Sequence, residues 1–367
     1  MILFFEIGPL KEREFTGIAQ VTAAIAEQII GDQDMQSEFF YGRMIVPKSV
    51  VEGLLEARNG ELLEWYLRRI KPQPAPNSVA PSVGVFPNRK TARRAFSKEC
   101  QIIHDLSTLL APQFHNQDTI AFHATTMEQD ILTNDVTFCV SEATRSDVLA
   151  YFPHVAPESI QTLPLAAALA SDAHTGWRSF RLTEQYVLVL GTIEPRKNVA
   201  QVLRYIRANP EFMERYRVVF LGRFGWGKDI DELIRDYQLY QQYNRGRLLF
   251  PGFVTEEIKS ILIGNAQILI YPSLFEGFGL PVLEAAALGV PCVTTKSSSL
   301  PEAGGPSSYY FDPFATGDFD AVFETALHHA GSNRSAIRDK CQKWASAFSW
   351  KRTYDVLKSR IFAACVE

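Results

Sequence analysis

The chain has 367 residues, of which 46% are hydrophobic and 21% are charged, and its net charge is −4 at pH 7. This length favours two domains over a single core, and the composition is that of a globular protein without a disorder signature. The slightly acidic balance argues against a nucleic-acid partner, because nucleic-acid-binding domains usually carry a strongly basic face.

Cysteines and apolar runs indicate a cytoplasmic protein. The five cysteines are widely spaced and form no CxxC pair, so we expect reduced core thiols rather than a disulfide framework or a zinc site. The apolar opening MILFF stops at Glu6 with no basic segment before it, which predicts a first strand rather than a signal peptide. No apolar run approaches the roughly 18 to 20 residues that a membrane span requires.

The first half alternates short apolar runs with helical patterns, which is typical of parallel α/β sheets. Helices are expected at 17–30 and at 141–152, the second capped by Ser141. A Pro-, Ala- and Ser-rich stretch at 164–182 is the expected domain linker. The predicted strands of this half are 2–6, 82–86, 101–104 and 136–140.

The second half repeats this pattern five times, and each apolar strand leads directly into a Gly, Pro or polar loop. Ligands of open α/β sheets bind beyond the carboxyl ends of the strands, so we expect these loops to gather at one sheet edge. The predicted strands are 186–190, 216–222, 247–250, 266–271 and 291–295.

The stretch YPSLFEGFGLPVLEAAALGVPCV follows one of these strands. Gly277 and Gly279 allow close backbone approach, Pro281 suits the first turn of a helix, and Gly289 suits the position after its end. The start of this helix, at 280–282, would offer free N–H groups and a positive dipole end to a phosphate.

Two carboxylates flank that phosphate seat and would repel an anion. Glu276 and Glu284 could instead accept hydrogen bonds from sugar and ribose hydroxyls on either side of a diphosphate. The alternative is a solvated loop residue and a surface helix residue, and the residues alone leave both open. Arg196 and Lys197, in GTIEPRKN, should project from the same edge and could neutralise a diphosphate leaving group.

The motifs GTIEPRKN, GFVTEEIKS…LFEGFGLPVLEAAALGVPCVTT and SSLPEAGG together resemble the donor half of glycosyltransferase family 4. Weaker similarity runs through TGIAQVT, IIHDLSTLLAP and DVTFCVSEATRSDV, and the ending FSWKRT resembles the family's C-terminal segment. The resemblance implies an α/β fold of the GT-B type, with two Rossmann-like domains facing across a cleft. It also implies a C-terminal helix that crosses back to the first domain.

The resemblance also implies roles for the site residues. Glu276 would contact hydroxyls of the donor sugar and Glu284 the ribose, while Arg196 and Lys197 would grip the diphosphate. Further contacts to phosphate or sugar are implied for the backbone of Phe278, Gly279 and Leu280, and to the base for that of Gly252, Phe253 and Val254.

In the first domain the resemblance implies two more contacts. His104 would point at the transferred sugar, although a satisfied strand-end histidine is the alternative, and Gly17 would lie near the donor phosphates. The family often has GIGR at that helix start, whereas this chain has Gly17-Ile18-Ala19-Gln20 and lacks the second glycine and the arginine. This departure puts the acceptor-side and phosphate contacts of the loop in doubt.

Three further patterns have weaker implications. The D-x-D pairs at 32/34, 229/231 and 318/320 are expected to cap helices rather than hold a metal, and we expect no metal or cofactor. GRFGWGK is a poor match to the fingerprint of nicotinamide-binding proteins, and Trp226 is expected in a cleft wall.

A basic cluster in the first half is expected to be a solvated face, and an anionic acceptor and a membrane surface are its alternative partners. The members of the cluster are Arg68, Arg69, Lys71, Arg89, Lys90, Arg93, Arg94 and Lys98.

The sequence therefore predicts a retaining enzyme that moves a hexose from a UDP- or GDP-linked sugar to a hydroxyl of a saccharide or lipid-linked saccharide. Residues 1–170 with about 351–367 would form the acceptor-side domain, and 171–350 the donor domain. We expect cytoplasmic localisation, with peripheral contact at the inner membrane face as the alternative. The alternatives are a nucleotide-sugar epimerase and a non-catalytic nucleotide-sugar-binding protein, and the altered loop at Gly17 is the one feature in favour of the latter.

Overall fold

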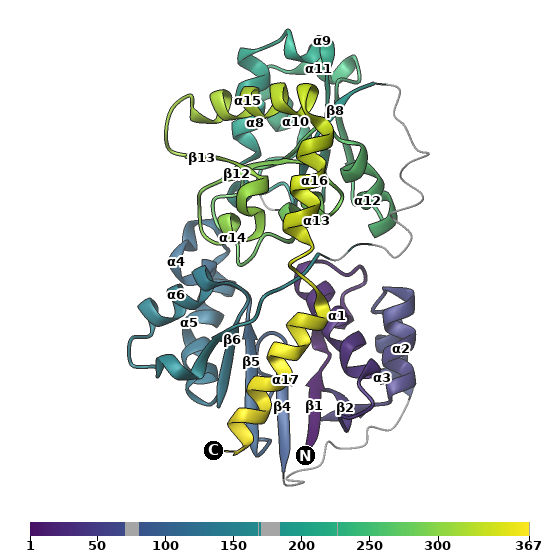
Figure 1. The fold of residues 1–367 in the computed structure, drawn as a ribbon, viewed down its shortest axis with the longest axis vertical. Helices are drawn as coiled ribbons and strands as arrows, with labels where there is room; N and C mark the ends of the chain where they lie inside the picture. The colour runs from purple at the N-terminus through teal and green to yellow at the C-terminus, as the bar shows by residue number, and fades with distance from the viewer. Residues whose placement is uncertain (70–80, 168, 170–183, 226, 367) are drawn as a thin grey trace. The chain divides into compact units, whose positions relative to one another are not determined.

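The computed structural model describes the chain except residues 70–80, 168, 170–183, 226 and 367. The described chain divides into two compact units, Met1–Ala168 with Phe348–Glu367, and Leu169–Ala347 (Figure 1). Trp226, Lys71 and most of the predicted linker lie outside the described residues.

The first unit is built on a seven-stranded sheet in the order β3-β2-β1-β4-β5-β6-β7, parallel except for the β2–β3 pair. Strand β1 lies inside this sheet and is buried: Leu3, Phe4 and Phe5 are at most 1% exposed. The strands are β1 (Ile2–Glu6), β2 (Ser37–Tyr41), β3 (Met44–Val46), β4 (Ser82–Phe86), β5 (Lys98–Ile103), β6 (Val136–Cys139) and β7 (Ile160–Thr162).

Helices connect these strands, and the C-terminal helix returns to this unit. Helix α17 (Trp350–Val366) packs on α1 (Gly17–Gly31), where the Tyr354 hydroxyl donates to Asp32 Oδ2 at 2.8 Å (Figure 1). The remaining helices are α2 (Lys48–Ala57), α3 (Glu61–Arg69), α4 (Ser107–Leu110), α5 (Gln117–Leu132) and α6 (Glu142–Tyr151), with short 3₁₀ turns η1 (Gly8–Lys11), η2 (Pro112–Phe114) and η3 (Pro157–Ser159).

The second unit has a six-stranded, fully parallel sheet in the order β10-β9-β8-β11-β12-β13. Numbered within the unit, this order is 3-2-1-4-5-6, the strand order of dinucleotide-binding Rossmann folds. Leu188 of β8 lies opposite Val219 on one side and Leu269 on the other. The strands are β8 (Tyr186–Leu190), β9 (Arg217–Leu221), β10 (Leu248–Gly252), β11 (Leu269–Tyr271), β12 (Cys292–Thr295) and β13 (Tyr309–Phe311).

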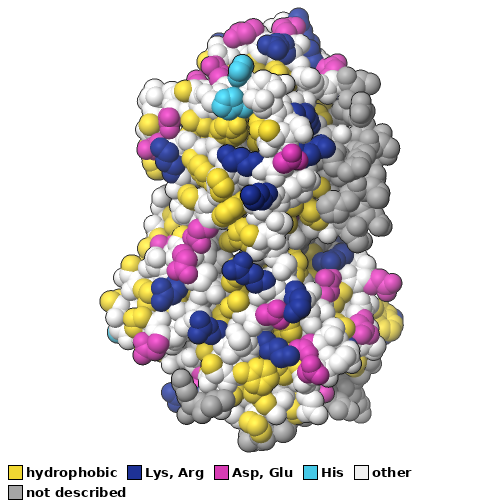
Figure 2. Space-filling model, viewed as in Figure 1, with side chains coloured by type: hydrophobic (Ala, Val, Ile, Leu, Met, Phe, Trp, Pro, Cys, Tyr) yellow, Lys and Arg dark blue, Asp and Glu magenta, His cyan; other side chains and the backbone are white. Residues whose placement is uncertain are grey.

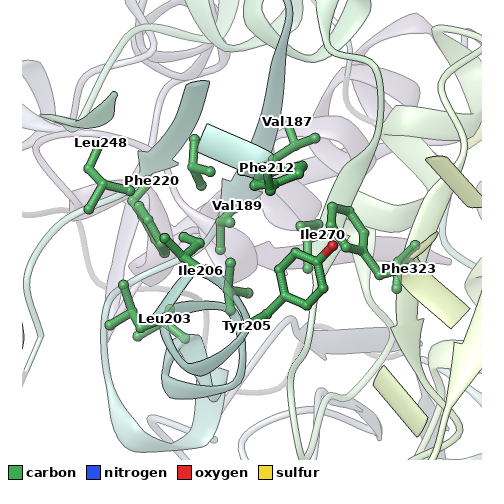
Figure 3. Packing of buried hydrophobic residues seen from close by; sticks show 14 of the residues in the cluster. Val187, Val189, Leu203, Tyr205, Ile206, Phe212, Phe220, Leu248, Ile270 and Phe323 are labelled. Carbon is green, nitrogen blue, oxygen red and sulfur yellow. The ribbon is translucent and has the colours of Figure 1, made fainter. Parts of the chain in front are cut away.

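The core of the second unit forms where α8 (Val199–Ala208) packs on this sheet. Its buried side chains Val199, Val202, Leu203 and Ile206 recur at the spacing of one helix face. Figure 3 shows Leu203 and Ile206 packed together with strand residues of the sheet. The other helices are α9 (Phe212–Arg215), α10 (Ile230–Asp236), α11 (Tyr240–Asn244), α12 (Glu256–Asn265), α13 (Leu280–Ala287), α14 (Leu300–Gly304), α15 (Asp318–Ser332) and α16 (Arg334–Ala345), with the 3₁₀ turns η4 (Pro195–Lys197) and η5 (Gly305–Ser307).

The α/β fold with two Rossmann-like domains and a returning C-terminal helix is confirmed. All nine predicted strands exist, with ends that differ by up to three residues. The predictions missed β2, β3, β7 and β13, of which all but β2 have only three residues. Ser141 caps α6 as expected, because its side chain accepts a hydrogen bond from the Thr144 N–H.

Two expectations about charged side chains are wrong. Asp32 does not cap the start of a helix but follows the end of α1 and binds Lys358 and Tyr354, whereas Asp229 does cap α10. The basic cluster is not simply a solvated face, because the Lys90 side chain is fully buried and pairs with Glu99.

Other members of the basic cluster also have internal partners. Arg93 pairs with Asp130 at 2.6 Å, and Lys98 pairs with Asp135 at 3.0 Å. On the face drawn in Figure 2, basic side chains are interspersed with acidic ones rather than gathered in one patch. No helix in the described part of the chain is long and apolar enough to cross a bilayer.

Candidate functional site

The topology of the second sheet places two loops side by side. From β8 the chain crosses to β9 on one side, and from β11 it crosses to β12 on the other, so β8 and β11 flank the switch point of the sheet. Ligands of doubly wound sheets bind beyond the strand ends at this point. The loop after β8 carries Arg196 and Lys197, and the loop after β11 carries Glu276.

Close backbone packing fixes the loop after β8. Gly222 follows β9 at a φ of +151°, and a side-chain carbon there would lie 2.1 Å from the Gly191 carbonyl oxygen, so only glycine fits. The two loops are also joined directly, because Leu274 N–H donates to the Arg196 carbonyl at 2.9 Å. Arg196 Nη1 in turn donates to the Phe275 carbonyl at 2.7 Å.

Glu276 is the centre of a buried polar cluster. Its Oε1 accepts hydrogen bonds from Lys197 Nζ, from the Tyr271 hydroxyl at 2.9 Å and from the Ser273 hydroxyl at 2.5 Å. Its Oε2 lies 3.2 Å from Arg196 Nη1. Glu276 is 8% exposed, so it is not the solvated loop residue of the alternative interpretation.

These donors decide the charge of Glu276. Burial alone would raise the pKa of this carboxyl, but the charges of Lys197 and Arg196 outweigh burial and lower it to about 2. Burial and the charge of Arg196 lower the pKa of Lys197, and Glu276 opposes both. Arg196 pairs as well with Glu194 at 3.1 Å, so the two cations face two carboxylates.

A glycine with a left-handed backbone precedes α13, and two serine hydroxyls hold the loop before it. Gly279 precedes the helix at a φ of +100°, and a side chain there would meet Leu300 at 2.8 Å. Phe278 is buried, and Leu280 is the first helical residue. The Ser298 and Ser299 hydroxyls both donate to the Glu276 carbonyl, at 2.5 and 2.9 Å. Pro281 and Gly289, at a φ of +76°, occupy the positions expected at the two ends of the helix.

Glu284 is also buried, at 1% exposure, so the interpretation as a surface helix residue is wrong. Its Oε1 accepts a hydrogen bond from Lys259 Nζ at 3.2 Å. Its Oε2 lies 3.1 Å from the same nitrogen, yet accepts no hydrogen bond from any residue that the structure describes. Burial raises the pKa of Glu284, Lys259 lowers it, and the nearby Glu256 raises it.

The predicted base-binding backbone ends strand β10. Gly252 has a φ of +77°, and a side-chain carbon there would meet nothing within 4 Å, so the space beside it is open. Phe253 is 37% exposed, and the Arg223 guanidinium lies 4.6 Å from its ring centre. Val254 follows, and Thr255 caps α12 by accepting from the Ile258 N–H.

The first unit holds the remaining two predicted residues, one at the start of a helix and one after a strand. Gly17 is exposed and begins α1, while Gln20 turns inward and donates to the Phe15 carbonyl at 3.4 Å. His104 follows β5, and its Nε2 donates to the Pro87 carbonyl at 2.7 Å. Burial lowers the pKa of His104, which leaves the ring neutral near pH 7.

Three residues around the site were missed from the sequence. Tyr271 and Ser273 complete the Glu276 cluster, and their positions at the end of β11 could have suggested this. Lys259 lies in the first turn of α12 and gave no such signal. Among the described residues, no group of three or more His, Cys, Asp or Glu side chains could hold a metal ion.

Together these features suit one kind of ligand. Arg196 and Lys197, which pair with carboxylates of the same cluster, and the start of α13 gather cationic and N–H donors within a small, mostly buried region. Glu284 presents a carboxylate oxygen without a hydrogen-bond donor a turn further along α13. An anion that carries hydroxyl groups matches both features.

A family model described as glycosyl transferases group 1 matches residues 178–344. The chain is 30% identical over 259 residues to the Escherichia coli "O-antigen chain mannosyltransferase B", a match that covers 68% of this chain and 66% of the relative. The chain has the GT-B fold, and the group 1 glycosyl transferase model matches within its second unit.

A second relative of this GT-B chain is the Escherichia coli "Serotype-specific mannosyltransferase WbdA", 28% identical over 60% of this chain and 28% of the relative. The chain thus spans less than two thirds of the length of either relative. Among solved structures, Anabaena Alr3699/HepE in complex with UDP and glucose has the same fold, with a TM-score of 0.64 and 15% identity over 98% of both chains.

Proposed function

We propose that this chain transfers a hexose from a nucleotide diphosphate sugar to a hydroxyl of a saccharide or lipid-linked saccharide, with retention of the anomeric configuration. The Arg196–Lys197–Glu276 cluster at the switch point of the second sheet carries the proposal. The names of the relatives make mannose the first sugar to test. UDP, named in a structure of similar fold, and GDP are the first nucleotides to test.

In the proposed reaction the bond from the sugar C1 to the β-phosphate oxygen breaks, and the acceptor oxygen bonds to C1 on the same face. The acceptor proton passes to the leaving phosphate oxygen. Negative charge develops on the diphosphate as the bond breaks, so Arg196, Lys197 and the start of α13 would stabilise the transition state. Glu276 would hold the two cations in place through its contacts with them. In the complex with the donor, it would accept hydrogen bonds from hydroxyls of the sugar.

Other residues have supporting roles in this proposal. Glu284 would accept hydrogen bonds from the ribose, and the backbone at Gly252, Phe253 and Val254 would contact the base. Further backbone contacts to phosphate or sugar would come from Phe278, Gly279 and Leu280. In the acceptor-side unit, Gly17 would lie near the donor phosphates and the His104 side chain would point at the transferred sugar. No metal or cofactor takes part in the proposed reaction.

The test is a transfer assay with GDP- and UDP-linked hexoses and a panel of saccharide acceptors, with and without EDTA. We expect nucleoside diphosphate release that depends on acceptor and persists in EDTA, and NMR of the product should show the donor's anomeric configuration. Donor conversion to another sugar without acceptor would instead support an epimerase. Tight donor binding without turnover under any condition would support the non-catalytic alternative.

A further inference from the structure

Lys259 lies between two carboxylates at the interface of α12 and α13. Its ammonium nitrogen is 2.7 Å from Glu256 Oε2 and 3.2 and 3.1 Å from the two oxygens of Glu284. The Lys259 side chain is 13% exposed and that of Glu284 is 1% exposed. Glu256 is one turn earlier on the same helix and gives the lysine a second carboxylate partner.

Lys259 is the one cation with a hydrogen bond to Glu284 within the described ranges. Lys259 and Glu256 are the groups whose charges shift the Glu284 pKa. Buried titratable groups on the other elements packed against α13 are neutral at pH 7, because burial raises the pKa of each; they are Tyr271 on β11, Cys292 on β12 and Cys341 on α16. Charged side chains on the other packed helices include Glu302 on α14 and Arg338 on α16.

We propose that Lys259 is a positioning residue that keeps the buried Glu284 ionised and oriented to accept the ribose hydroxyls of the donor nucleotide. This inference rests on the proposed function. The Lys259 nitrogen lies close to both oxygens of Glu284 but donates a hydrogen bond to Oε1 alone, so the buried Oε2 keeps its capacity to accept from a ligand hydroxyl. Two oxygens of an ionised carboxylate can serve both partners, whereas a protonated carboxyl would lose acceptor capacity.

The inference makes nucleotide affinity depend on pH in a specific way. Burial already raises the pKa of Glu284 above its ordinary value, and removal of the lysine charge would raise it further. Glu284 would then bind its proton at higher pH values than it does in the wild-type protein. Without Lys259 the affinity should therefore fall as the pH decreases, and the loss should be largely recovered at high pH.

The experiment measures the affinity of UDP and GDP by titration calorimetry at pH 6 and pH 9 for the wild-type protein, Lys259→Met, Lys259→Arg and Glu284→Gln. Lys228→Met is the matched control, because Lys228 is an exposed lysine of the same unit that pairs with Asp236. We expect Lys259→Met to weaken binding at least tenfold at pH 6 and far less at pH 9. Lys259→Arg and Lys228→Met should bind at both pH values as the wild-type protein does.

The double variant Lys259→Met/Glu284→Gln separates positioning from packing. If the lysine acts through Glu284, the double variant should bind no more weakly than Glu284→Gln alone. Wild-type affinity of Lys259→Met at both pH values would overturn the inference, and so would an equal loss at both or a further loss in the double variant. If the wild-type protein itself bound no nucleoside diphosphate, the proposed function would fail, and with it this inference.

Discussion

Glu276 and Glu284 differ in their surroundings far more than in their burial. Glu276 receives two hydroxyls and two cations, and its pKa is lowered to about 2. Glu284 has one lysine, and its pKa is raised. Because both are less than a tenth exposed, the opposite directions of their pKa shifts follow from the donors around each carboxyl rather than from a difference in burial. The first is a fixed anion that orders two cations, and the second needs help to remain ionised.

The largest expected difference between these carboxyls is in stability. Glu276→Gln leaves two buried cations facing a neutral amide, which should lower the free energy of unfolding at pH 7 by roughly 3–5 kcal/mol. Glu284→Gln should lower it much less, because Glu284 is the less stabilised anion. Urea unfolding of both variants measures the two values, and equal losses would contradict the comparison.

The same comparison predicts the pH range in which the contribution of Glu276 to the free energy of unfolding is lost. A carboxyl with a lowered pKa contributes stability that is complete above its unfolded value of about 4.5 and is lost as the pH falls through its folded value of about 2. The wild-type protein and Glu276→Gln should therefore converge in unfolding free energy between these two pH values. Curves that stay parallel down to pH 2 would show that Glu276 is not the group responsible.

Lys197→Met removes the cation that donates to Glu276 Oε1. The loss of one preorganised donor to a developing anion typically lowers kcat about a hundredfold to a thousandfold, and we expect a loss of this size in the transfer assay. Lys228→Met should retain its rate, and circular dichroism should show that both variants are folded. Full activity of folded Lys197→Met would remove this residue from the mechanism.

Glu6 extends the comparison to a buried carboxyl whose pKa is raised by burial more strongly than it is lowered by the Gly8 backbone N–H and the charge of Arg89. It is 2% exposed at the end of β1, its Oε1 accepts no hydrogen bond within the described part of the chain, and burial raises its pKa to about 7. A raised pKa stabilises the fold below pH 4.5, and that contribution is lost as the pH rises to about 7.

Glu6→Gln should therefore stabilise the protein at pH 8, by at most about 3 kcal/mol if the whole pKa difference from 4.5 to about 7 acts on folding. At pH 5 the same change should have little effect. Thermal unfolding at the two pH values measures this difference, and equal midpoint shifts at both would contradict the assignment.

The smallest expected effect concerns the backbone that supports Glu276. The Ser299 hydroxyl is fully buried and donates to the Glu276 carbonyl, which also accepts from Ser298. Ser299→Ala should lower the unfolding free energy by about 1 kcal/mol, because the carbonyl keeps one donor. Since the carboxylate contacts are untouched, the pH dependence of stability should match that of the wild-type protein. A loss of stability over a different acidic pH range would contradict the independence of the carbonyl and carboxylate contacts of Glu276.

The sequence predicted the positions of the site elements better than their contacts. Strand ends followed by Gly, Pro and polar loops placed Arg196, Lys197 and Glu276 at one sheet edge, because parallel strands share their carboxyl edge. The sequence did not predict that Glu276 pairs with both cations, since this depends on how two loops far apart in the chain pack together. Lys259 was missed because a lysine within a helix is usually solvated, and only the packing of α12 on α13 brings it to Glu284.

The measurement that tests the central claim most directly is thermal unfolding of the purified protein with GDP, UDP and ADP and their sugar conjugates, with and without EDTA. A ligand that binds only the folded state raises the unfolding midpoint. The proposed donor site predicts a rise with one base that persists in EDTA and is lost in Lys197→Met and in Glu284→Gln. No rise with any of these ligands, or an equal rise in the folded Lys197→Met variant, would contradict a nucleotide-sugar site at the β8–β11 edge.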